Sequence, residues 1–438
     1  MKYDLIIIGF GKAGKTLAAK AATLGKKVAL IEKSDKMYGG TCINIGCIPT
    51  KKLVTLSKDA KFFSDRNEYF CKSMEAKDTL VSALRAKNYG MLNDNPNVTL
   101  IKATAKFKDE NTILADGEEL SAPIIVINTG SKEKDIPFEV KSNQIYTSTT
   151  ILNLKTLPKH LIVLGMGFIG LEFASMFANF GSKVTIMARK NEFLPDLDND
   201  TSSSVKEALQ AQGIEIILGS KFERLDGDTL SFNQNGISKN IKADAFLAAF
   251  GRTPAIDELS LQNANIAVGD KCEVLVNDHL QTTIPHIYAV GDCKGGPEFT
   301  YISLDDYRIV FNHIFGDKTR SSANRSVWAT TTFMDTELSQ VGKSEKELSK
   351  HELKIAKVNL SSVPMAKVLA HDTGFMKAIV DKNSDEILGI TLHCKNANEI
   401  INMFSLAMEN KIKASKFKSQ IFTHPSISEA INDLFSQI

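Results

Sequence analysis

The chain has 438 residues, 43% of them hydrophobic, which is too long for one ordinary hydrophobic core and predicts two to four domains. Its 53 Lys and Arg nearly balance its 51 Asp and Glu, so a formal net charge of +2 gives no reason to expect a nucleic-acid or membrane partner. No apolar run approaches the roughly 18 residues that cross a bilayer, and we expect a cytoplasmic protein.

Six cysteines are too few for a disulfide scaffold in a chain of this length. Cys42 and Cys47 form a close pair, which in a reducing compartment indicates catalysis, redox sensing or metal binding. The other four stand far apart, and we expect reduced, buried thiols: Cys71, Cys272, Cys293 and Cys394.

The first 32 residues predict a dinucleotide-binding unit. A strand over 3–8, a glycine-rich turn over 9–14, an alanine-rich helix and a strand over 27–31 follow one another. Glu32, at the end of the second strand, is placed to accept hydrogen bonds from a ribose. An incidental glycine turn is the alternative, which this context disfavours. The three glycines serve the tight turn, the approach of a pyrophosphate and helix–strand packing, in the order Gly9, Gly11 and Gly14.

The close cysteines lie in the segment Gly39-Gly-Thr-Cys-Ile-Asn-Ile-Gly-Cys-Ile-Pro-Thr-Lys51. Residues five apart on a regular helix lie roughly 140° apart around its axis, so a bond between the sulfurs requires an irregular turn, for which Gly46 supplies the freedom. Pro49 suits the first turn of a helix to about Ala60, whose amino end would favour a Cys47 thiolate. A zinc half-site and idle core thiols are the alternatives. We expect no metal, because no second Cys or His pair has suitable spacing.

A second glycine-rich turn predicts a second dinucleotide-binding unit. Strands over 160–164 and 183–187 flank the turn and a helix to about Phe180, and such alternation predicts parallel sheets. Arg189 and Lys190 follow where the first unit has an acid, which favours pairing with the 2′-phosphate of NADPH. If both are solvated surface cations, NADH remains usable. The glycines of this turn are Gly165, Gly167 and Gly170.

The last third of the chain predicts further elements. Residues 272–292 are strand-like, and from about Trp328 onward strands and amphipathic helices predict a separate α+β domain.

Near the end, His424 is followed five residues later by Glu429, which suggests a carboxylate holding one imidazole nitrogen. A structural histidine without a catalytic role is the alternative.

The segment 40–51 resembles the active-site signature of the pyridine nucleotide-disulfide oxidoreductases, and other motifs carry the resemblance in order along nearly the whole chain. The resemblance implies an α/β protein with two Rossmann-like domains that bind FAD and NAD(P), and a C-terminal α+β dimerisation domain. The expected FAD domain comprises 1–150 and 271–320, the NAD(P) domain 151–270 and the dimerisation domain 321–438. Besides the two glycine turns, the supporting motifs are Thr129-Gly130, Gly251-Arg-Thr-Pro254, Ala289-Val-Gly-Asp292 and His424-Pro-Ser-Ile-Ser-Glu429.

The resemblance also implies a role for each matching residue. Cys47 would be the charge-transfer thiol beside FAD, and Cys42 the thiol that meets the substrate. Lys51 would lie near the flavin and pair with Glu172. His424, oriented by Glu429, would act as acid and base in the active site of the partner subunit of a homodimer. Besides the glycine turns, FAD would contact Glu32, Thr41, Thr129, Gly130 and Asp292, and the nicotinamide nucleotide would contact Arg189, Lys190, Gly251 and Arg252.

The substrate is a small-molecule oxidant in this interpretation. We expect neither the extra C-terminal cysteine pair of mercuric reductases nor the substrate-binding segments of large-disulfide reductases. The chain is similar to short bacterial reductases of the reactive-chlorine-resistance type, which include hypothiocyanous acid reductases, over 9–17, 37–40, 299–306 and 420–424. Reduction of hypothiocyanous acid to thiocyanate is therefore the predicted reaction. Mercuric ion, copper(II), glutathione disulfide or lipoamide are alternative substrates, and a flavin-containing redox sensor is the non-enzymatic alternative.

Overall fold

The computed structural model describes residues 2–348 and 352–438. The chain forms two compact units, each assembled from three stretches of sequence. The division between them falls within two helices, α3 (Cys47–Ser57) and α4 (Arg66–Asn93). The domain limits expected from the sequence stay a prediction. The first unit comprises Met1–Lys52, Met74–Asp135 and Phe250–Arg325, and the second Leu53–Ser73, Ile136–Ala249 and Ser326–Ile438.

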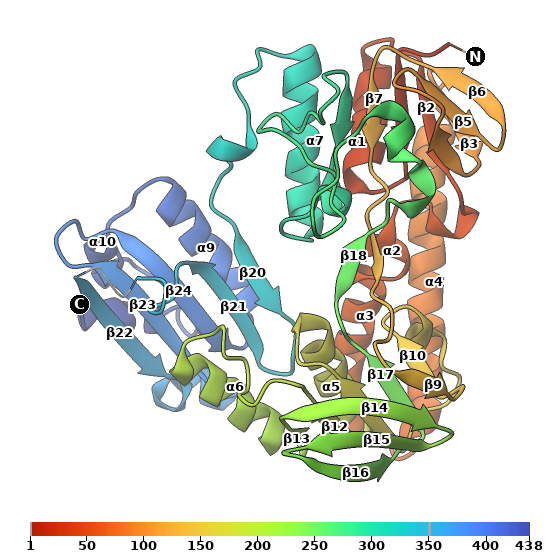
Figure 1. Cartoon of the computed structure of the whole chain (residues 1–438). Coiled ribbons are helices and arrows are strands. Elements are labelled where there is room, and N and C mark those ends of the chain that lie inside the picture. Colours follow the sequence, from red (N-terminus) through yellow and green to blue (C-terminus); the bar gives the residue numbers. More distant parts are fainter. Residues whose placement is uncertain (1, 349–351) are drawn as a thin grey trace. The chain divides into compact units, whose positions relative to one another are not determined.

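A five-stranded parallel sheet forms the centre of the first unit (Figure 1). Side chains alternate along its β1 strand, so Leu5 and Ile7 pack in one core and Ile6 and Ile8 in another. Helices α1 (Lys12–Thr23) and α7 (Thr300–Phe315) contribute to the core around Leu5. The strand order is β19 (Ile287–Ala289), β7 (Ile125–Ile127), β1 (Leu5–Ile8), β2 (Val28–Glu32) and β3 (Val98–Lys102).

Two small antiparallel sheets complete the first unit. One supplies Phe107, Ile113 and Leu120 to the core around Ile6 and consists of β4 (Ala105–Phe107), β5 (Thr112–Ala115) and β6 (Glu118–Ser121). The other pairs β8 (Ser131–Glu133) with β18 (Arg252–Pro254).

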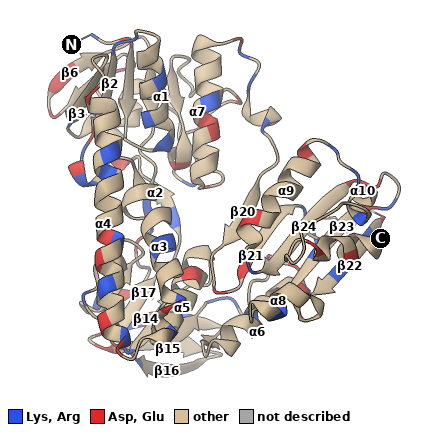
Figure 2. Ribbon diagram, turned by 180° about the vertical axis from the view of Figure 1, so that it is seen from behind, with Lys and Arg blue, Asp and Glu red and all other residues tan. Residues whose placement is uncertain are grey.

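Helix α4 carries Lys and Arg interspersed with Asp and Glu (Figure 2), which explains why no apolar stripe marks it in the sequence.

The second unit repeats the parallel architecture. Strands β11 (His160–Leu164) and β12 (Lys183–Met187) begin and end where the sequence predicts, because buried apolar runs alternate there with turns. Helices α5 (Phe168–Phe180) and α6 (Asn199–Ala211) follow these strands. The sheet order is β10 (Ile145–Thr147), β17 (Ala245–Ala248), β11, β12 and β13 (Glu215–Ile217), and a further sheet holds β16 (Ile237–Lys242), β15 (Thr229–Gln234), β14 (Ser220–Asp226) and β9 (Glu139–Lys141).

The C-terminal part of the second unit is an antiparallel sheet with helices, as predicted. Its apolar core joins the sheet to α9 (Ala397–Glu409), α10 (Ala414–Lys418) and α11 (Ala430–Ser436). A short helix, α8 (Pro364–Val368), lies between two of the strands in sequence. The strand order is β20 (Ala329–Thr332), β21 (Glu337–Gly342), β24 (Ile387–Cys394), β23 (Phe375–Asp381) and β22 (Leu353–Asn359).

Two expectations need correction. Of the strand-like region 272–292, only β19 forms a named strand, and Val274 and Gln281 make isolated bridges, because turns interrupt the run. Cys293 and Cys394 are buried as expected, but Cys71 is half-buried and Cys272 is exposed. Over the described residues, no helix combines the length and the apolar character needed to span a bilayer.

Candidate active site

The two close cysteines lie on either side of a break between two helices. Helix α2 (Thr41–Asn44) carries Cys42, and Cys47 is the first residue of α3. Gly46 lies in the break, and a Cβ there would stand 3.0 Å from the Thr41 carbonyl oxygen and 3.3 Å from Cys42 Cα. Glycine thus relieves a tight approach of the backbone here, whereas the sequence had suggested conformational freedom, and Gly46 is not among the glycines with positive φ. Pro49 lies in the first turn of α3, as predicted.

The thiols of Cys42 and Cys47 interact directly. The hydrogen bond to Cys47, burial and the charge of Cys47 together raise the pKa of Cys42, while Thr300 and Lys15 act to lower this pKa. Cys47 Sγ also lies 3.7 Å from Thr300 Oγ1 at the start of α7. Burial, followed by the charge of Cys47, raises the pKa of the adjacent Tyr301 to about 12. The ionisation of one thiol therefore affects that of the other, and a neighbouring hydroxyl contacts the pair.

The first glycine turn has the geometry of a dinucleotide site. Gly9 has φ +101°, and a Cβ there would stand 2.3 Å from the Asn128 carbonyl oxygen. At Gly14 a Cβ would stand 2.5 Å from Asn128 Nδ2, so helix α1 packs closely on the sheet. Glu32 accepts hydrogen bonds from Phe10 N (3.0 Å) and Ser34 N, and burial raises the pKa of its carboxyl group.

A buried hydroxyl nearby fits a bound ligand. Thr129 Oγ1 is buried and has no hydrogen-bond partner within the described residues. Such an atom is costly to bury unless a ligand supplies the partner. Thr129 and Gly130 are among the residues predicted to contact FAD, so the first unit fits this cofactor. Thr41, also predicted, is the first residue of α2, and Gly40 before it lies against the first glycine turn, since a Cβ there would stand 2.8 Å from Gly11 Cα.

Ser131 connects two further predicted residues of the first unit. It donates from Oγ to Asp292 Oδ2 (2.8 Å). Arg252 donates from Nε to Ser131 Oγ (2.8 Å) and from Nη2 to the Ser131 carbonyl oxygen (2.7 Å). The structure therefore brings Asp292 and Arg252 together, although the sequence had assigned them to different nucleotides. Gly251 precedes Arg252 with φ +96°, and a nicotinamide contact for both stays a prediction.

The second glycine turn offers an open approach to a helix terminus. Gly165 and Gly170 are crowded, since a Cβ at either would stand 2.4 Å from a carbonyl oxygen. Gly167, the N-cap of α5, has open space where its Cβ would be, as the approach of a pyrophosphate requires. After β12, Arg189 and Lys190 are exposed, and Lys190 pairs with Asp196 (2.8 Å). Their pairing with a 2′-phosphate stays a prediction.

An imidazole and a carboxylate form a pair near the C-terminus. His424 Nδ1 lies 2.6 Å from Glu429 Oε2, while the His424 side chain is 76% exposed. The bond engages Nδ1, so Nε2 is the ring nitrogen that could transfer a proton. The predicted carboxylate–imidazole contact is therefore present in the second unit.

The predicted partners Lys51 and Glu172 are placed on α3 and α5. Glu172 is buried, and its Oε1 accepts a hydrogen bond from Phe333 N (3.0 Å). Their pairing with each other stays a prediction.

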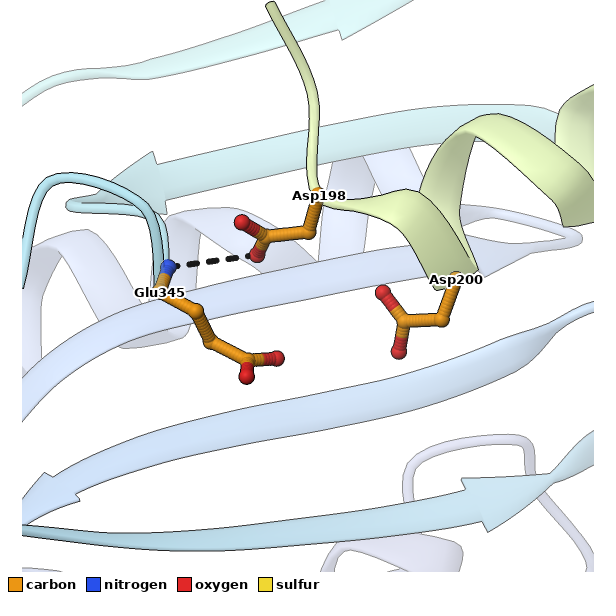
Figure 3. Close-up of side chains that lie close together, drawn as sticks. All are labelled: Asp198, Asp200 and Glu345. Atoms are coloured by element: carbon orange, nitrogen blue, oxygen red, sulfur yellow. Dashed lines mark hydrogen bonds between the residues drawn. The ribbon is translucent and has the colours of Figure 1, made fainter. Parts of the chain in front are cut away.

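One group of carboxylates in the described chain has the spacing of a metal site, and a lysine fills it. Oxygens of Asp198, Asp200 and Glu345 lie within 4.8 Å of one another (Figure 3). Lys377 Nζ donates to all three, at 2.9, 2.8 and 2.7 Å, and its side chain is 1% exposed. We call these four residues the Lys377 ion cluster. It joins the start of α6 to β23 within the second unit, and no sequence pattern indicated it.

Comparison with known proteins identifies the family of the chain. The sequence matches the family model "Pyridine nucleotide-disulphide oxidoreductase" over residues 3–306 and the dimerisation-domain model of that family over residues 328–435. It is 42% identical to "Probable pyridine nucleotide-disulfide oxidoreductase RclA" of Escherichia coli, covering 100% of this chain and 99% of the relative. A solved structure, the "Cu(II) complex of HOCl-induced flavoprotein disulfide reductase RclA" from Escherichia coli, superposes with a TM-score of 0.95 over 100% of both chains.

More distant relatives have other named activities. A mercuric reductase of Lysinibacillus sphaericus is 34% identical over 98% of this chain and 81% of its own length. A dihydrolipoyl dehydrogenase of Geobacillus stearothermophilus is 31% identical over 97% of this chain and 94% of its own length. The chain therefore belongs to the pyridine nucleotide-disulphide oxidoreductase family, and FAD and a nicotinamide nucleotide are its cofactors.

Proposed function

We propose that this flavoprotein uses NAD(P)H to reduce hypothiocyanous acid to thiocyanate. The observation that carries the proposal is the interacting Cys42 and Cys47 pair across the α2–α3 break. The chain is similar to a disulfide reductase described as HOCl-induced, which supports a small oxidant of this chemical class as the substrate. When bound, FAD supplies the transfer of two electrons from the nicotinamide nucleotide to this pair.

The thiols perform the chemistry on the oxidant. The Cys42 thiolate attacks the sulfur of hypothiocyanous acid, forming a Cys42–S–SCN adduct and releasing hydroxide, which is protonated to water. Cys47 then attacks the Cys42 sulfur, expels thiocyanate and forms the disulfide. Overall, NAD(P)H and hypothiocyanous acid yield NAD(P)⁺, thiocyanate and water, so atoms and charge balance.

We further propose that the chain acts as a homodimer in which His424 serves the thiols of the partner subunit. The dimerisation-domain match supports the dimer, and the bond between His424 and Glu429 supports proton transfer. His424 would donate the proton to the departing hydroxide. Lys51 with Glu172 would sit beside the flavin, and Thr41, Thr129, Gly130 and Asp292 would hold FAD.

The proposal is tested with a panel of oxidants on the purified holoenzyme. Initial rates of NADPH and NADH oxidation are measured with hypothiocyanous acid, mercuric ion, copper(II), glutathione disulfide and lipoamide. We expect the highest kcat/KM with hypothiocyanous acid. Preferred turnover of glutathione disulfide or lipoamide would contradict the proposed substrate. Turnover below about 0.1 per second with every oxidant, well under usual enzyme rates, would indicate a redox sensor.

Copper(II) is the second candidate substrate, because the similar solved structure is a Cu(II) complex. Two adjacent thiols are soft ligands that suit the reduced Cu(I) product. In the same panel, copper(II) turnover exceeding that of hypothiocyanous acid would favour this candidate.

Replacing His424 tests the acid–base role. We expect His424→Gln to lower kcat/KM by about 10²- to 10⁴-fold, the usual contribution of a positioned proton donor, with FAD retained. Glu429→Gln should lower it less, since the imidazole stays but loses its orienting carboxylate. His286→Gln is the matched control, because the imidazole of His286 bonds the Glu110 carbonyl oxygen and its replacement should leave kcat/KM unchanged. Equal rates for His424→Gln and His286→Gln would disprove the role.

Arg189 is the test of nucleotide preference. We expect Arg189→Ala to raise the KM for NADPH by about 10-fold or more, the loss of one charge-assisted bond to a phosphate, and to leave the KM for NADH unchanged. Lys190→Ala should have a smaller effect because Lys190 already pairs with Asp196. Equal changes with both nucleotides would show that these are ordinary surface cations.

A further inference from the structure

Lys15 is a buried cation next to residues 39–51, which contain Cys42 and Cys47 and which we call the redox segment, and its hydrogen-bond partners are uncharged. It lies on α1 directly after the first glycine turn and is 6% exposed. Its Nζ donates to Asn88 Oδ1 (2.5 Å) and to the Gly39 carbonyl oxygen (3.3 Å). No carboxylate of the described residues forms an ion pair with it. A buried ammonium of this kind is unfavourable unless an anion in the working protein compensates it.

The turn that Lys15 contacts leads directly into the helix that carries Cys42. Gly39 and Gly40 both have positive φ, at +97° and +82°. A Cβ at Gly39 would stand 3.3 Å from Asn88 Cγ, and one at Gly40 would stand 2.8 Å from Gly11 Cα. The turn is therefore enclosed between α1 and α4, and the Lys15 ammonium contacts it three residues before Cys42.

Helix α4 places a second cation on the same segment. Arg85 Nε donates to Asn44 Oδ1 (2.7 Å), and Asn44 in turn donates to the Gly40 carbonyl oxygen (2.9 Å). Arg85 likewise forms no ion pair among the described residues. Both cations therefore contact this segment through neutral oxygens, which leaves their charge available to a thiolate.

The charges of Lys15 and Cys42 influence one another. Burial, followed by the charge of Lys12, lowers the pKa of Lys15 to about 8, and the charge of Cys42 acts in the opposite direction. The charge of Lys15 in turn acts to lower the pKa of Cys42. Other titratable or charged groups around the segment include Lys12 on α1, Tyr38 and Cys47 near Cys42 in sequence, Arg85 and Tyr89 on α4, and Tyr301 on α7.

We propose that Lys15 is a positioning residue that holds the turn before Cys42 and serves as the counter-charge of the Cys42 thiolate. This inference rests on the proposed function, because it explains how the attacking thiol becomes ionised when the pair is reduced. Lys15 acts through charge on Cys42 and does not itself contact the oxidant.

The test is the pH dependence of Cys42 alkylation in the holoenzyme. The protein is reduced with NADPH under anaerobic conditions and treated with iodoacetamide, and labelled Cys42 is quantified by mass spectrometry. We expect Lys15→Met to slow alkylation at pH 7 by about 10-fold, because one unit of pKa changes the thiolate fraction by that factor. Lys15→Arg, which keeps the charge, should preserve the wild-type profile, and all variants should keep the wild-type ratio of FAD to protein.

Several outcomes decide the matter. An alkylation profile of Lys15→Met that equals that of the wild type would overturn the proposal, as would loss of FAD, which would assign the ammonium to the cofactor's phosphates. If Lys15→Met does not fold, Lys15→Gln provides the same comparison with a polar, uncharged side chain. Hypothiocyanous acid failing as a substrate leaves alkylation unaffected, so this inference and the proposed function fail separately.

Discussion

Cys42→Ser should reduce hypothiocyanous acid at least roughly a thousandfold more slowly than the wild type while keeping its FAD, as expected when a catalytic nucleophile is removed. A serine hydroxyl stays protonated near pH 7, so the attack on the electrophilic sulfur has no nucleophile. Steady-state oxidation of NADPH with hypothiocyanous acid gives the rate, and visible absorbance gives the flavin content.

Two further variants sharpen the Cys42 experiment. Cys272→Ser is the matched control, since Cys272 is exposed and outside the redox segment, and it should have the wild-type rate. Cys47→Ser should form the Cys42–S–SCN adduct without expelling thiocyanate, which mass spectrometry detects. Wild-type turnover by Cys42→Ser would refute the thiol mechanism.

Lys377→Met should destabilise the second unit by about 3 kcal/mol, near the lower end of the cost of breaking a buried ion pair. The substitution keeps the apolar stem but removes the ammonium shared by three carboxylates, of which only Asp200 keeps another, that of Lys357. Asp200 and Glu345 are partly exposed, at 31% and 38% of their side chains, so solvent screens part of their repulsion. Thermal unfolding of the holoenzyme should show Tm lowered by several degrees.

Lys357→Met is the matched control for this prediction. Lys357 also pairs with Asp200 (3.1 Å), but its side chain is 37% exposed, so its loss should cost about 1 kcal/mol or less. Adding Asp198→Asn to Lys377→Met should restore part of the stability, and Ca²⁺ should raise the Tm of Lys377→Met alone, because the carboxylates can then bind it. Equal Tm values for Lys357→Met and Lys377→Met would contradict the role of the Lys377 ion cluster.

The difference between wild type and Lys377→Met should depend on pH. Burial acts to raise the pKa of Asp200, but Lys377 and Lys357 outweigh it and lower this pKa. The stabilisation that Asp200 contributes is therefore lost as the pH falls through its pKa in the folded protein. Burial acts to lower the pKa of Lys377, but its carboxylate partners outweigh it and raise this pKa. The stabilisation that Lys377 contributes is lost as the pH rises through its pKa in the folded protein. The Tm difference should therefore be largest near neutral pH.

The parallel sheets and both glycine turns could be predicted from the sequence because their determinants are local. The apolar run of β11 ends at Gly165 and that of β12 begins shortly after Gly181, so both strands lie where expected. The hydrogen bond between His424 and Glu429 could be predicted for the same reason, because its two residues are only five positions apart in the sequence.

Contacts between distant residues could not be predicted in this way. Lys15 and Asn88 are 73 residues apart, and Lys377 meets Asp198 across 179 residues. Lys377 lies in a strand that is otherwise apolar up to its last residue, where a charge gives no indication of its partner. The break at Gly46 was expected, but the close approach of the Thr41 carbonyl oxygen to this residue is visible only in three dimensions.

The Lys377 ion cluster has a consequence for a protein that would work among oxidants. A crosslink between α6 and β23 built from cysteines would be altered by the very compounds that react with exposed sulfur. Nitrogen and carboxylate oxygen atoms, enclosed at 1% exposure of the lysine, are not targets of a thiol-selective oxidant. This crosslink can therefore stay intact while accessible sulfurs elsewhere in the protein change their oxidation state.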